Sequence, residues 1–377
     1  MRHFDRWLMA TVCCGICMLT GCASHGRVTT ISNPVVPIVP TAKAKFAYTG
    51  DQGASLSGYS VNTTTGALTL LSGFPLTVGV NPIAVAVDPR NRFLFVADIA
   101  QSQLRVFTIN SSSGALGEIP TSPYATVHEP IAIAVDPSGT HVYVASQGSN
   151  SVGGYSVNAA GALTPIEGSP FPTSGTQNFG DSIVINAAGT FVYVQDLNSV
   201  YTYSVSSGSG ALALVQSVAG TSIGGNIALD PQGAYLYAVG PGTNSILAFS
   251  VDASTGLLTP ASPSPMVEQD GAYTISISPS GKFAYTIEKN NYLVSYTLQD
   301  GRFTQTGSVF AQVYGERIGI EPSGSFVFVP QACSYCQSGV YNVVNEFSIG
   351  STGALTKLSS SPVAAGTTPW GIAFTTQ

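Results

Sequence analysis

Short runs of apolar and aromatic residues recur along the chain from Lys45 onward, and turn residues separate them. The most regular run carries a ring-bearing residue at alternate positions. It occurs seven times, as Phe46-Ala-Tyr48, Phe93-Leu-Phe95, His141-Val-Tyr143, Phe191-Val-Tyr193, Tyr235-Leu-Tyr237, Phe283-Ala-Tyr285 and Phe326-Val-Phe328. The copies follow one another at intervals of 47, 48, 50, 44, 48 and 43 residues. Alternation with a period of two predicts β-strands, and the steady interval predicts a repeated structural unit.

Each repeat contains three more predicted strands. One precedes the aromatic strand and ends in a turn, as in Ile83-Ala-Val-Ala-Val-Asp88-Pro89. A third strand, such as Val152-Gly-Gly-Tyr-Ser-Val157, follows the aromatic one. The fourth strand opens with Gly-Ala-Leu, at Gly66, Gly114, Gly161, Gly210 and Gly353. A four-stranded meander of about fifty residues has the size of one β-propeller blade.

Apolar residues fill both faces of these strands, as in Phe93-Leu-Phe-Val-Ala97. In a sheet with one solvent-exposed face, apolar and polar residues would alternate along each strand. Each sheet is therefore predicted to lie between two others. In turns such as Asp136-Pro-Ser-Gly139, proline fixes φ and glycine accepts a positive φ, which favours a chain reversal. No apolar stripe at helical spacing runs for three turns. The sequence therefore predicts an all-β fold.

The two ends of the repeat region predict how the ring closes. The region opens at an aromatic strand, Lys45-Phe-Ala-Tyr48, which has no first strand before it. It ends with a lone first strand, Trp370-Gly-Ile-Ala-Phe374. Pairing the two fragments completes one blade and leaves no open sheet edge at the seam. We therefore predict that residues 44–377 form a seven-bladed β-propeller.

The first twenty-two residues have the three parts of a bacterial export signal. Arg2 and Arg6 precede an apolar run that ends at Leu19 and is short for a bilayer span. Leu19-Thr20-Gly21-Cys22 resembles the bacterial lipobox, in which the cysteine is acylated and becomes the mature amino terminus. We expect residues 1–21 to be a signal peptide, Cys22 to carry the lipid, and residues 22–43 to form a proline-spaced linker.

The expected lipid determines the expected location. Two or three acyl chains give a durable membrane attachment. Ala23 follows the cysteine and, by resemblance to the sorting of Gram-negative lipoproteins, favours the outer membrane, with the domain facing the periplasm. An uncleaved membrane helix and a chance match to the lipobox are the alternatives.

Charge limits the classes of partner. Loss of residues 1–21 would remove two of 13 basic and one of 19 acidic residues, which changes the net charge from −6 to −7. Phosphate binding requires clustered lysine and arginine, so nucleic acid is not expected as a partner. We expect a monomer without a cofactor that binds either a small lactone or an envelope protein.

Two cysteines remain after Cys22. Cys333 and Cys336 form a Cys-Ser-Tyr-Cys pair between two predicted strands. In an oxidising compartment such a pair most simply closes a small disulfide loop. Free thiols and a catalytic role are the alternatives, although a redox motif normally opens a helix. No metal site is predicted; Asp98 and Asp196, which end equivalent strands, are expected to cap loop amides, with calcium binding as the alternative.

Candidate ligand contacts lie where the first strands begin, because these starts gather around the central channel of a propeller. At the first position of each strand stand Ile83, Ile131, Asp181, Gly225, Tyr273, Glu316 and Trp370. At the next position stand Ala84, Ala132, Ser182, Asn226, Thr274, Arg317 and Gly371. The flanking loops add His128 and Glu129. The predicted ring is apolar over two adjacent blades and more polar over the rest.

The repeats resemble a known family. The pattern Pro-x-x-x-x-x-Asp-Pro-x-Gly-x-x-x-Tyr-Val, followed by Gly-Ala-Leu-Thr, is similar to that of the seven-bladed lactonases, namely propeller-type 6-phosphogluconolactonases and carboxymuconate-lactonizing enzymes. The resemblance covers residues 45–377. Family members commonly carry Pro-His at the channel mouth, whereas this chain has Pro82-Ile83, Pro130-Ile131 and Pro369-Trp370.

The resemblance implies hydrolysis of a lactone, which needs a base for water and a group that stabilises the oxyanion. Glu316 and Asp181 are the candidate bases, and Arg317 is the candidate carbonyl-polarising group. His128 or Glu129 would move protons. Asn226, Tyr273 and Trp370 are candidate substrate contacts. The alternative is a non-catalytic scaffold or binding propeller, in which these polar groups bind water, ions or one another.

Overall fold

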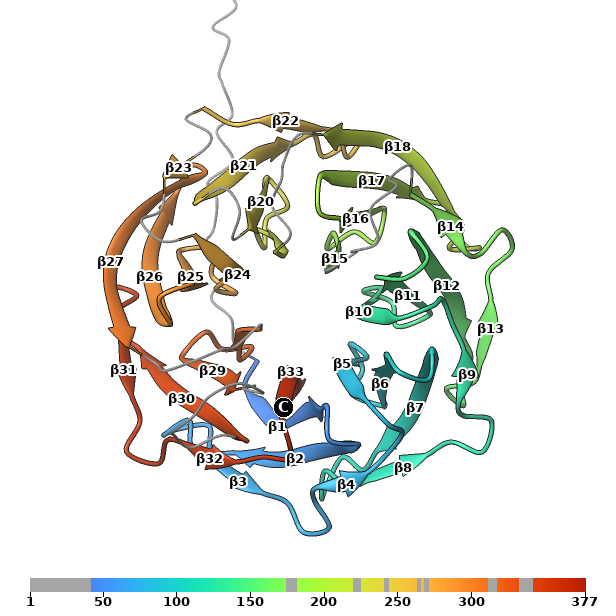
Figure 1. The fold of residues 1–377 in the computed structure, drawn as a ribbon, viewed down its shortest axis with the longest axis horizontal. Helices are drawn as coiled ribbons and strands as arrows, with labels where there is room; N and C mark the ends of the chain where they lie inside the picture. Colours follow the sequence, from blue (N-terminus) through green and yellow to red (C-terminus); the bar gives the residue numbers. More distant parts are fainter. Residues whose placement is uncertain are drawn as a thin grey trace, which may run out of the picture. The chain divides into compact units, whose positions relative to one another are not determined.

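The computed structural model describes residues 42–173, 182–219, 225–240, 244–262, 266–267, 271–310, 317–331 and 342–377. These residues form seven antiparallel sheets arranged in a ring around a central channel (Figure 1). They contain no helix, and hence none long and apolar enough to cross a membrane. The prediction of an all-β, seven-bladed propeller is confirmed.

The first strand of each blade lies next to the channel. These inner strands are β5 (Pro82–Val87), β10 (Pro130–Val135), β15 (Ser182–Ile185), β19 (Ile227–Leu229), β24 (Ala272–Ile277), β28 (Gly319–Ile320) and β33 (Pro369–Thr376). The aromatic strands pair with them from outside. They are β1 (Ala44–Asp51), β6 (Phe93–Asp98), β11 (His141–Ser146), β16 (Phe191–Gln195), β20 (Tyr235–Gly240), β25 (Phe283–Glu288) and β29 (Phe326–Gln331).

The third and fourth strands complete each blade. The third strands are β2 (Ser55–Val61), β7 (Gln103–Ile109), β12 (Ser151–Val157), β17 (Ser199–Val205), β21 (Ser245–Val251), β26 (Tyr292–Gln299) and β30 (Val343–Ile349). Two outer strands are continuous, β18 (Leu212–Ala219) and β27 (Arg302–Phe310). The other five are split in two, as β3 (Leu68–Leu70) with β4 (Leu76–Thr77), β8 (Leu116–Glu118) with β9 (Tyr124–Ala125), β13 (Leu163–Pro165) with β14 (Phe171–Pro172), β22 (Leu258–Pro260) with β23 (Met266–Val267), and β31 (Leu355–Lys357) with β32 (Val363–Ala364).

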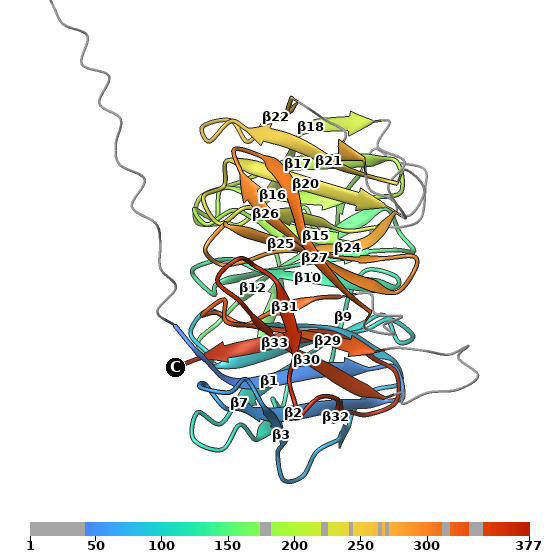
Figure 2. The same ribbon diagram turned by 90° about the vertical axis from the view of Figure 1, so that its left-hand side faces the viewer.

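The ring closes as the sequence predicts. Strand β33 pairs antiparallel with β1, and the register places Tyr48 opposite Ala373 and Gly50 opposite Gly371. The backbone N–H of Phe46 also donates to Thr375 Oγ1 at 2.9 Å. Both ends of the propeller chain therefore lie in one sheet, as the edge-on view shows (Figure 2).

A contact between neighbouring blades explains why the aromatic strand and the Gly-Ala-Leu turn recur together. The glycine that opens each fourth strand has a positive φ, and a Cβ added there would collide with the first aromatic of the preceding blade. The contact at the seam is of the same kind: a Cβ on Gly66 would lie 2.2 Å from Phe326. The seven pairs are Gly66–Phe326, Gly114–Phe46, Gly161–Phe93, Gly210–His141, Gly256–Phe191, Gly301–Tyr235 and Gly353–Phe283. Only glycine satisfies both the backbone and the packing.

The second ring in each aromatic strand fills the space between sheets. Tyr48 and Tyr143 are fully buried, and their hydroxyls donate to the carbonyls of Gly114 and Gly210 at 2.8 and 2.7 Å. Buried hydroxyls need such partners, because an unpaired polar group is costly inside a protein. The aromatic repeats are therefore core, as predicted.

The Asp-Pro turns and the strand-end aspartates cap backbone amides. In the turn after β10, Asp136 Oδ1 accepts the N–H groups of Thr140 and His141, both at 2.7 Å. At the opposite end of the sheets, Asp98 accepts the Val80 N–H at 2.7 Å and Asp196 accepts the Ser199 N–H at 2.7 Å. Both residues cap loop amides as predicted.

Several predictions concern residues outside the described part of the chain. They are the signal peptide, Cys22, nearly all of the linker and the Cys333–Cys336 pair.

Candidate functional site

The central channel holds a cavity of about 480 Å³, within the range of roughly 300–1,000 Å³ that is usual for small-molecule sites. Every inner strand contributes to it. The lining residues are Ile83, Ala84, Val85, Ile131, Ala132, Ile133, Ser182, Ile183, Val184, Asn226, Ile227, Ala228, Leu229, Ile275, Ser276, Ile277, Arg317, Ile318, Ile320, Trp370, Gly371 and Ile372. The predicted positions at the second residue of the strand line the cavity in six of seven blades.

Most inner strands that start within the described residues begin with an irregularity. In β5 the register shifts between Pro82 and Ala84, so that Ile83 is an extra residue opposite β6. The same shift leaves Ile131, Tyr273 and Trp370 as extra residues in β10, β24 and β33. A bulge re-aims side chains that strict alternation would separate. Ile83 and Ala84 can therefore both line the cavity.

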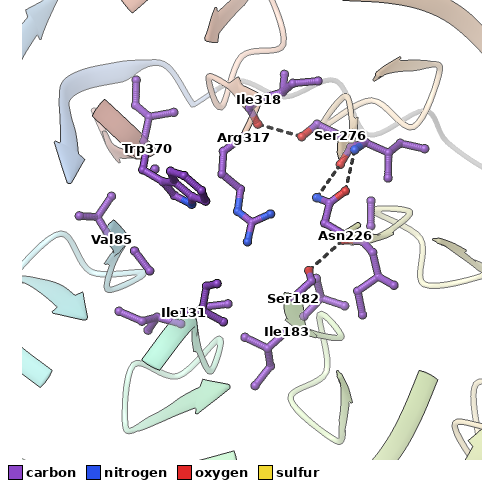
Figure 3. Close-up of a pocket in the computed structure, with 18 of the residues that line it drawn as sticks. Val85, Ile131, Ser182, Ile183, Asn226, Ser276, Arg317, Ile318 and Trp370 are labelled. Carbon is purple, nitrogen blue, oxygen red and sulfur yellow. Dashed lines mark hydrogen bonds between the residues drawn. The ribbon is translucent and has the colours of Figure 1, made fainter. Parts of the chain in front are cut away.

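Arg317 and Trp370 stand out from the aliphatic wall. The Arg317 side chain extends toward the middle of the channel, and the Trp370 indole projects from the wall of the same cavity (Figure 3). The indole Nε1 is buried and has no hydrogen-bond partner among the residues that the structure describes. An N–H group can only donate, so this atom can bind only an acceptor. Arg317 is the one cationic side chain among the described residues of the cavity wall.

The remaining polar side chains of the wall bridge neighbouring blades. The Asn226 amide binds the backbone of Ile275 twice: its Oδ1 accepts the N–H at 2.7 Å, and its Nδ2 donates to the carbonyl at 3.1 Å. Ser276 Oγ donates to the Ile318 carbonyl at 2.8 Å, and Ser182 Oγ donates to the Ile227 carbonyl at 3.5 Å (Figure 3). These side chains satisfy main-chain groups at the inner edge of the next sheet.

The family whose description is lactonase, 7-bladed beta-propeller, matches residues 33–135 and 132–272. The chain belongs to this family. No curated protein gives a significant match.

Solved structures share the fold of this lactonase-family propeller at low identity. A Bacteroides uniformis protein assigned as a 6-phosphogluconolactonase is 17% identical, with a TM-score of 0.74 over 88% of this chain and 100% of its own. The periplasmic gluconolactonase PpgL of Pseudomonas aeruginosa is 19% identical, with a TM-score of 0.69 over 87% and 98%. A Lactobacillus plantarum protein is 20% identical, with a TM-score of 0.72 over 88% and 99%. At such identities the likeness shows the fold alone.

The structure brings together some of the predicted site residues of this lactonase-family propeller. Arg317, Trp370 and Asn226 line the cavity, whereas Tyr273, 44% exposed, does not. Both polar groups of the Asn226 amide are engaged by Ile275, so its predicted contact with a substrate stays a prediction.

His128 and Glu129 lie in the loop before β10 and do not line the cavity. His128 is exposed, and its carbonyl accepts the Gly148 N–H at 3.2 Å. Glu129 has a φ of 54°, and its carbonyl accepts the Gln147 N–H at 2.9 Å. Their backbones thus hold the β11–β12 loop, and their proton-transfer roles stay predictions.

The candidate bases Asp181 and Glu316 lie outside the described residues. No described residue of the cavity wall is a carboxylate, a histidine or a cysteine. In the same part of the chain, no three histidine, cysteine, aspartate or glutamate residues lie close enough to hold a metal ion.

Sequence reasoning missed the third position of each inner strand. Val85, Ile133, Ile183, Ile227, Ile275, Ile318 and Ile372 all line the cavity. The signal was present as a β-branched residue at the same place in every repeat. Interpreting this signal requires knowing that the inner strands begin with a bulge, which changes the direction of the side chains that follow.

Proposed function

We propose that this lactonase-family propeller hydrolyses a lactone at the mouth of its channel. The observation that carries the proposal is the position of Arg317, whose guanidinium extends into a cavity built from all seven inner strands. Family membership supports a lactone as the substrate class. A preorganised cation in a shielded cavity stabilises negative charge that develops on a carbonyl oxygen.

The proposed reaction adds one water to the lactone. Water attacks the carbonyl carbon, and the oxyanion that forms is stabilised by the Arg317 guanidinium. The carbon–oxygen bond of the ring then breaks, and the ring oxygen takes the proton that water has lost. The product is a hydroxy acid. Glu316 or Asp181 is the proposed base, and His128 or Glu129 the proposed proton shuttle.

A panel of sugar-derived and aliphatic lactones tests this proposal on the full chain. Hydrolysis above background is expected for at least one lactone. Arg317→Gln should lower kcat about 100-fold or more, in line with the loss of an oxyanion donor. Glu316→Ala should also abolish turnover if Glu316 is the base. Arg302→Gln, a change on the outer strand β27, is the matched control and should leave turnover unchanged. Background rates across the whole panel would exclude hydrolysis.

A second candidate is a non-catalytic binding propeller in the cell envelope. The observation that favours it is the lack of any base or nucleophile among the described residues of the cavity wall. Incubation of the full chain with envelope extract should then recover one defined partner at physiological salt. Recovery of none would count against this candidate.

We also propose that the protein works at the outer membrane, facing the periplasm, attached through Cys22. The Leu19-Thr20-Gly21-Cys22 motif supports the attachment. Labelling with radioactive palmitate should mark the wild-type chain in the membrane fraction. The Cys22→Ser chain should remain unlabelled, and equal labelling of the two would exclude Cys22 as the lipid site.

A further inference from the structure

The indole N–H of Trp370 lacks an acceptor among the described residues, which suggests that a ligand supplies one. The proposed hydrolysis does not by itself say which ligand group this is. Nε1 is buried, and no oxygen of the described residues accepts its hydrogen. A buried donor without an acceptor costs roughly 1–3 kcal/mol. A bound oxygen atom beside Trp370 would remove that cost.

Arg317 adds a second donor group to the wall of the same cavity. The guanidinium carries five N–H donors, which can serve more than one partner at a time. Arg317 is only partly buried, and its long side chain has several rotatable bonds. A carboxylate has two oxygens that can accept from the guanidinium and from Nε1 together.

The charge of the site favours a monoanion. Arg317 is the one cation among the described residues that line the cavity, and the whole chain has a net charge of −6. A phosphate ester carries a charge of about −1.5 to −2 at neutral pH, which a single guanidinium does not neutralise. We therefore expect phosphorylated ligands to bind this site more weakly than monocarboxylates.

We propose that Arg317 and Trp370 form a carboxylate-binding site that holds unphosphorylated monocarboxylic acids. The inference rests on the proposed function in one respect: such an acid is what the hydrolysis of an unphosphorylated lactone would release. The carboxylate site itself serves equally in a protein that only binds.

The chain offers a direct readout of occupancy. It contains two tryptophans, Trp7 and Trp370, so the tryptophan fluorescence of the full chain with Trp7→Phe, excited where tyrosine does not absorb, comes from Trp370 alone. Gluconate, hexanoate and benzoate are suitable ligands because all three are monocarboxylates. The carboxylate is attached to a hydroxylated chain in gluconate, to an alkyl chain in hexanoate and to an aromatic ring in benzoate. At least one of them should change the Trp370 emission saturably, with the same affinity by calorimetry. Sorbitol, which replaces the carboxylate of gluconate by a hydroxyl, should bind at least tenfold more weakly than gluconate or not at all.

Two variants locate the carboxylate. Trp370→Phe keeps the ring and removes the N–H, and should weaken binding of the carboxylate about tenfold by calorimetry, as expected for a hydrogen bond to a charged group. Arg317→Gln should weaken it at least as much, and Arg302→Gln should not change it. A further measurement compares the binding of gluconate with that of 6-phosphogluconate on the chain with the native channel. It needs no channel variant, so it still decides if Trp370→Phe lowers the melting temperature.

The outcomes separate this inference from the proposed hydrolysis. Two results would overturn the carboxylate site even if lactones are hydrolysed. One is binding of 6-phosphogluconate as tight as that of gluconate. The other is no binding of any of the three carboxylates up to about 10 mM. Carboxylate binding without hydrolysis of any lactone would support the site and exclude the hydrolase. An unchanged affinity in folded Trp370→Phe would remove Trp370 from the site.

Discussion

The inner wall of the ring is built in two different ways on its two sides. We call β33, β5 and β10 the close arc, because their second positions hold Gly371, Ala84 and Ala132. We call β15, β19, β24 and β28 the bridged arc, because the side chains of Ser182, Asn226 and Ser276 bind the backbone of the next blade along it. The close arc uses small residues, and the bridged arc uses polar ones.

The reason for the difference is how closely the backbones approach. A Cβ on Gly371 would lie 2.8 Å from the Ile83 carbonyl oxygen, so the backbones of β33 and β5 leave no room for a side chain. In the bridged arc the Asn226 amide takes the place of a strand and pairs with both main-chain groups of Ile275. A polar residue at a channel mouth is thus not by itself a ligand contact.

Deleting residues 370–377 should have the largest effect, because it removes β33 and with it one side of the close arc. The loss of the pairing with β1 and of the packing of Phe374 against Phe328 should cost about 5 kcal/mol or more, and lower the melting temperature by about 10 °C or abolish cooperative unfolding. Thermal unfolding followed by circular dichroism measures this. A chain lacking Gln377 alone is the control, and an unchanged melting temperature in the long deletion would contradict the closure.

Gly371→Ala tests the close approach within that arc. The added methyl would overlap the Ile83 carbonyl and should cost about 2–3 kcal/mol, as overpacking usually does. Chemical denaturation gives the free energy of unfolding. Gly307→Ala on β27 is the matched control, since nothing lies within 4 Å of its added Cβ. Equal stability of the two variants would mean that β33 and β5 can move apart freely.

The repeat made the fold predictable, because the strand pattern, the turn residues and the repeat spacing all indicate a β-propeller. The aromatic strand and the Gly-Ala-Leu turn recur at a blade's spacing, and the unpaired strands at Phe46 and Ile372 required closure. The interlock of Gly66 with Phe326 was not predicted, because it joins residues of different blades and arises only when the ring is built.

The site was predictable only in part. Arg317 and Trp370 followed from their place in the repeat, and both line the cavity. The sequence could not distinguish them from Asn226, whose amide serves the backbone of the next blade. Whether a polar side chain faces the cavity or binds the next blade depends on the distance between two inner strands. The repeat pattern of the sequence does not reveal that distance. His128, the candidate proton shuttle from a flanking loop, does not line the cavity.

Asn226→Ala breaks the bridge in the bridged arc. It leaves the Ile275 N–H and carbonyl without their partners and should cost about 1–2 kcal/mol by chemical denaturation. Thr274→Val is the matched control at the equivalent position of the next strand. The Thr274 hydroxyl is buried and has no hydrogen-bond partner among the described residues, so its removal should be neutral or slightly stabilising. A larger loss in Thr274→Val than in Asn226→Ala would reverse the interpretation of this arc.

The smallest expected effect compares two carboxylates beside the close arc, Asp51 and Asp98, which end equivalent strands. Backbone amides hold Asp98, whereas hydroxyls hold Asp51: Ser57 Oγ donates at 2.7 Å and Thr49 Oγ1 at 2.8 Å. Burial raises the pKa of Asp51 to about 6, although the hydroxyl donors and the Gly366 N–H oppose the rise.

Because the pKa of Asp51 in the folded chain lies above its ordinary value of 3.8, the folded state holds this proton more tightly than the unfolded state does. The stability that protonated Asp51 adds is complete below about pH 4 and is lost as the pH rises through about 6. Between pH 5 and pH 7 the wild-type chain should therefore lose on the order of 1 kcal/mol more than Asp51→Asn, which cannot ionise. Asp98→Asn in parallel separates this effect from the loss of a cap. Unfolding free energies of wild type and Asp51→Asn that run parallel over this range would show that the hydroxyls alone compensate the buried charge.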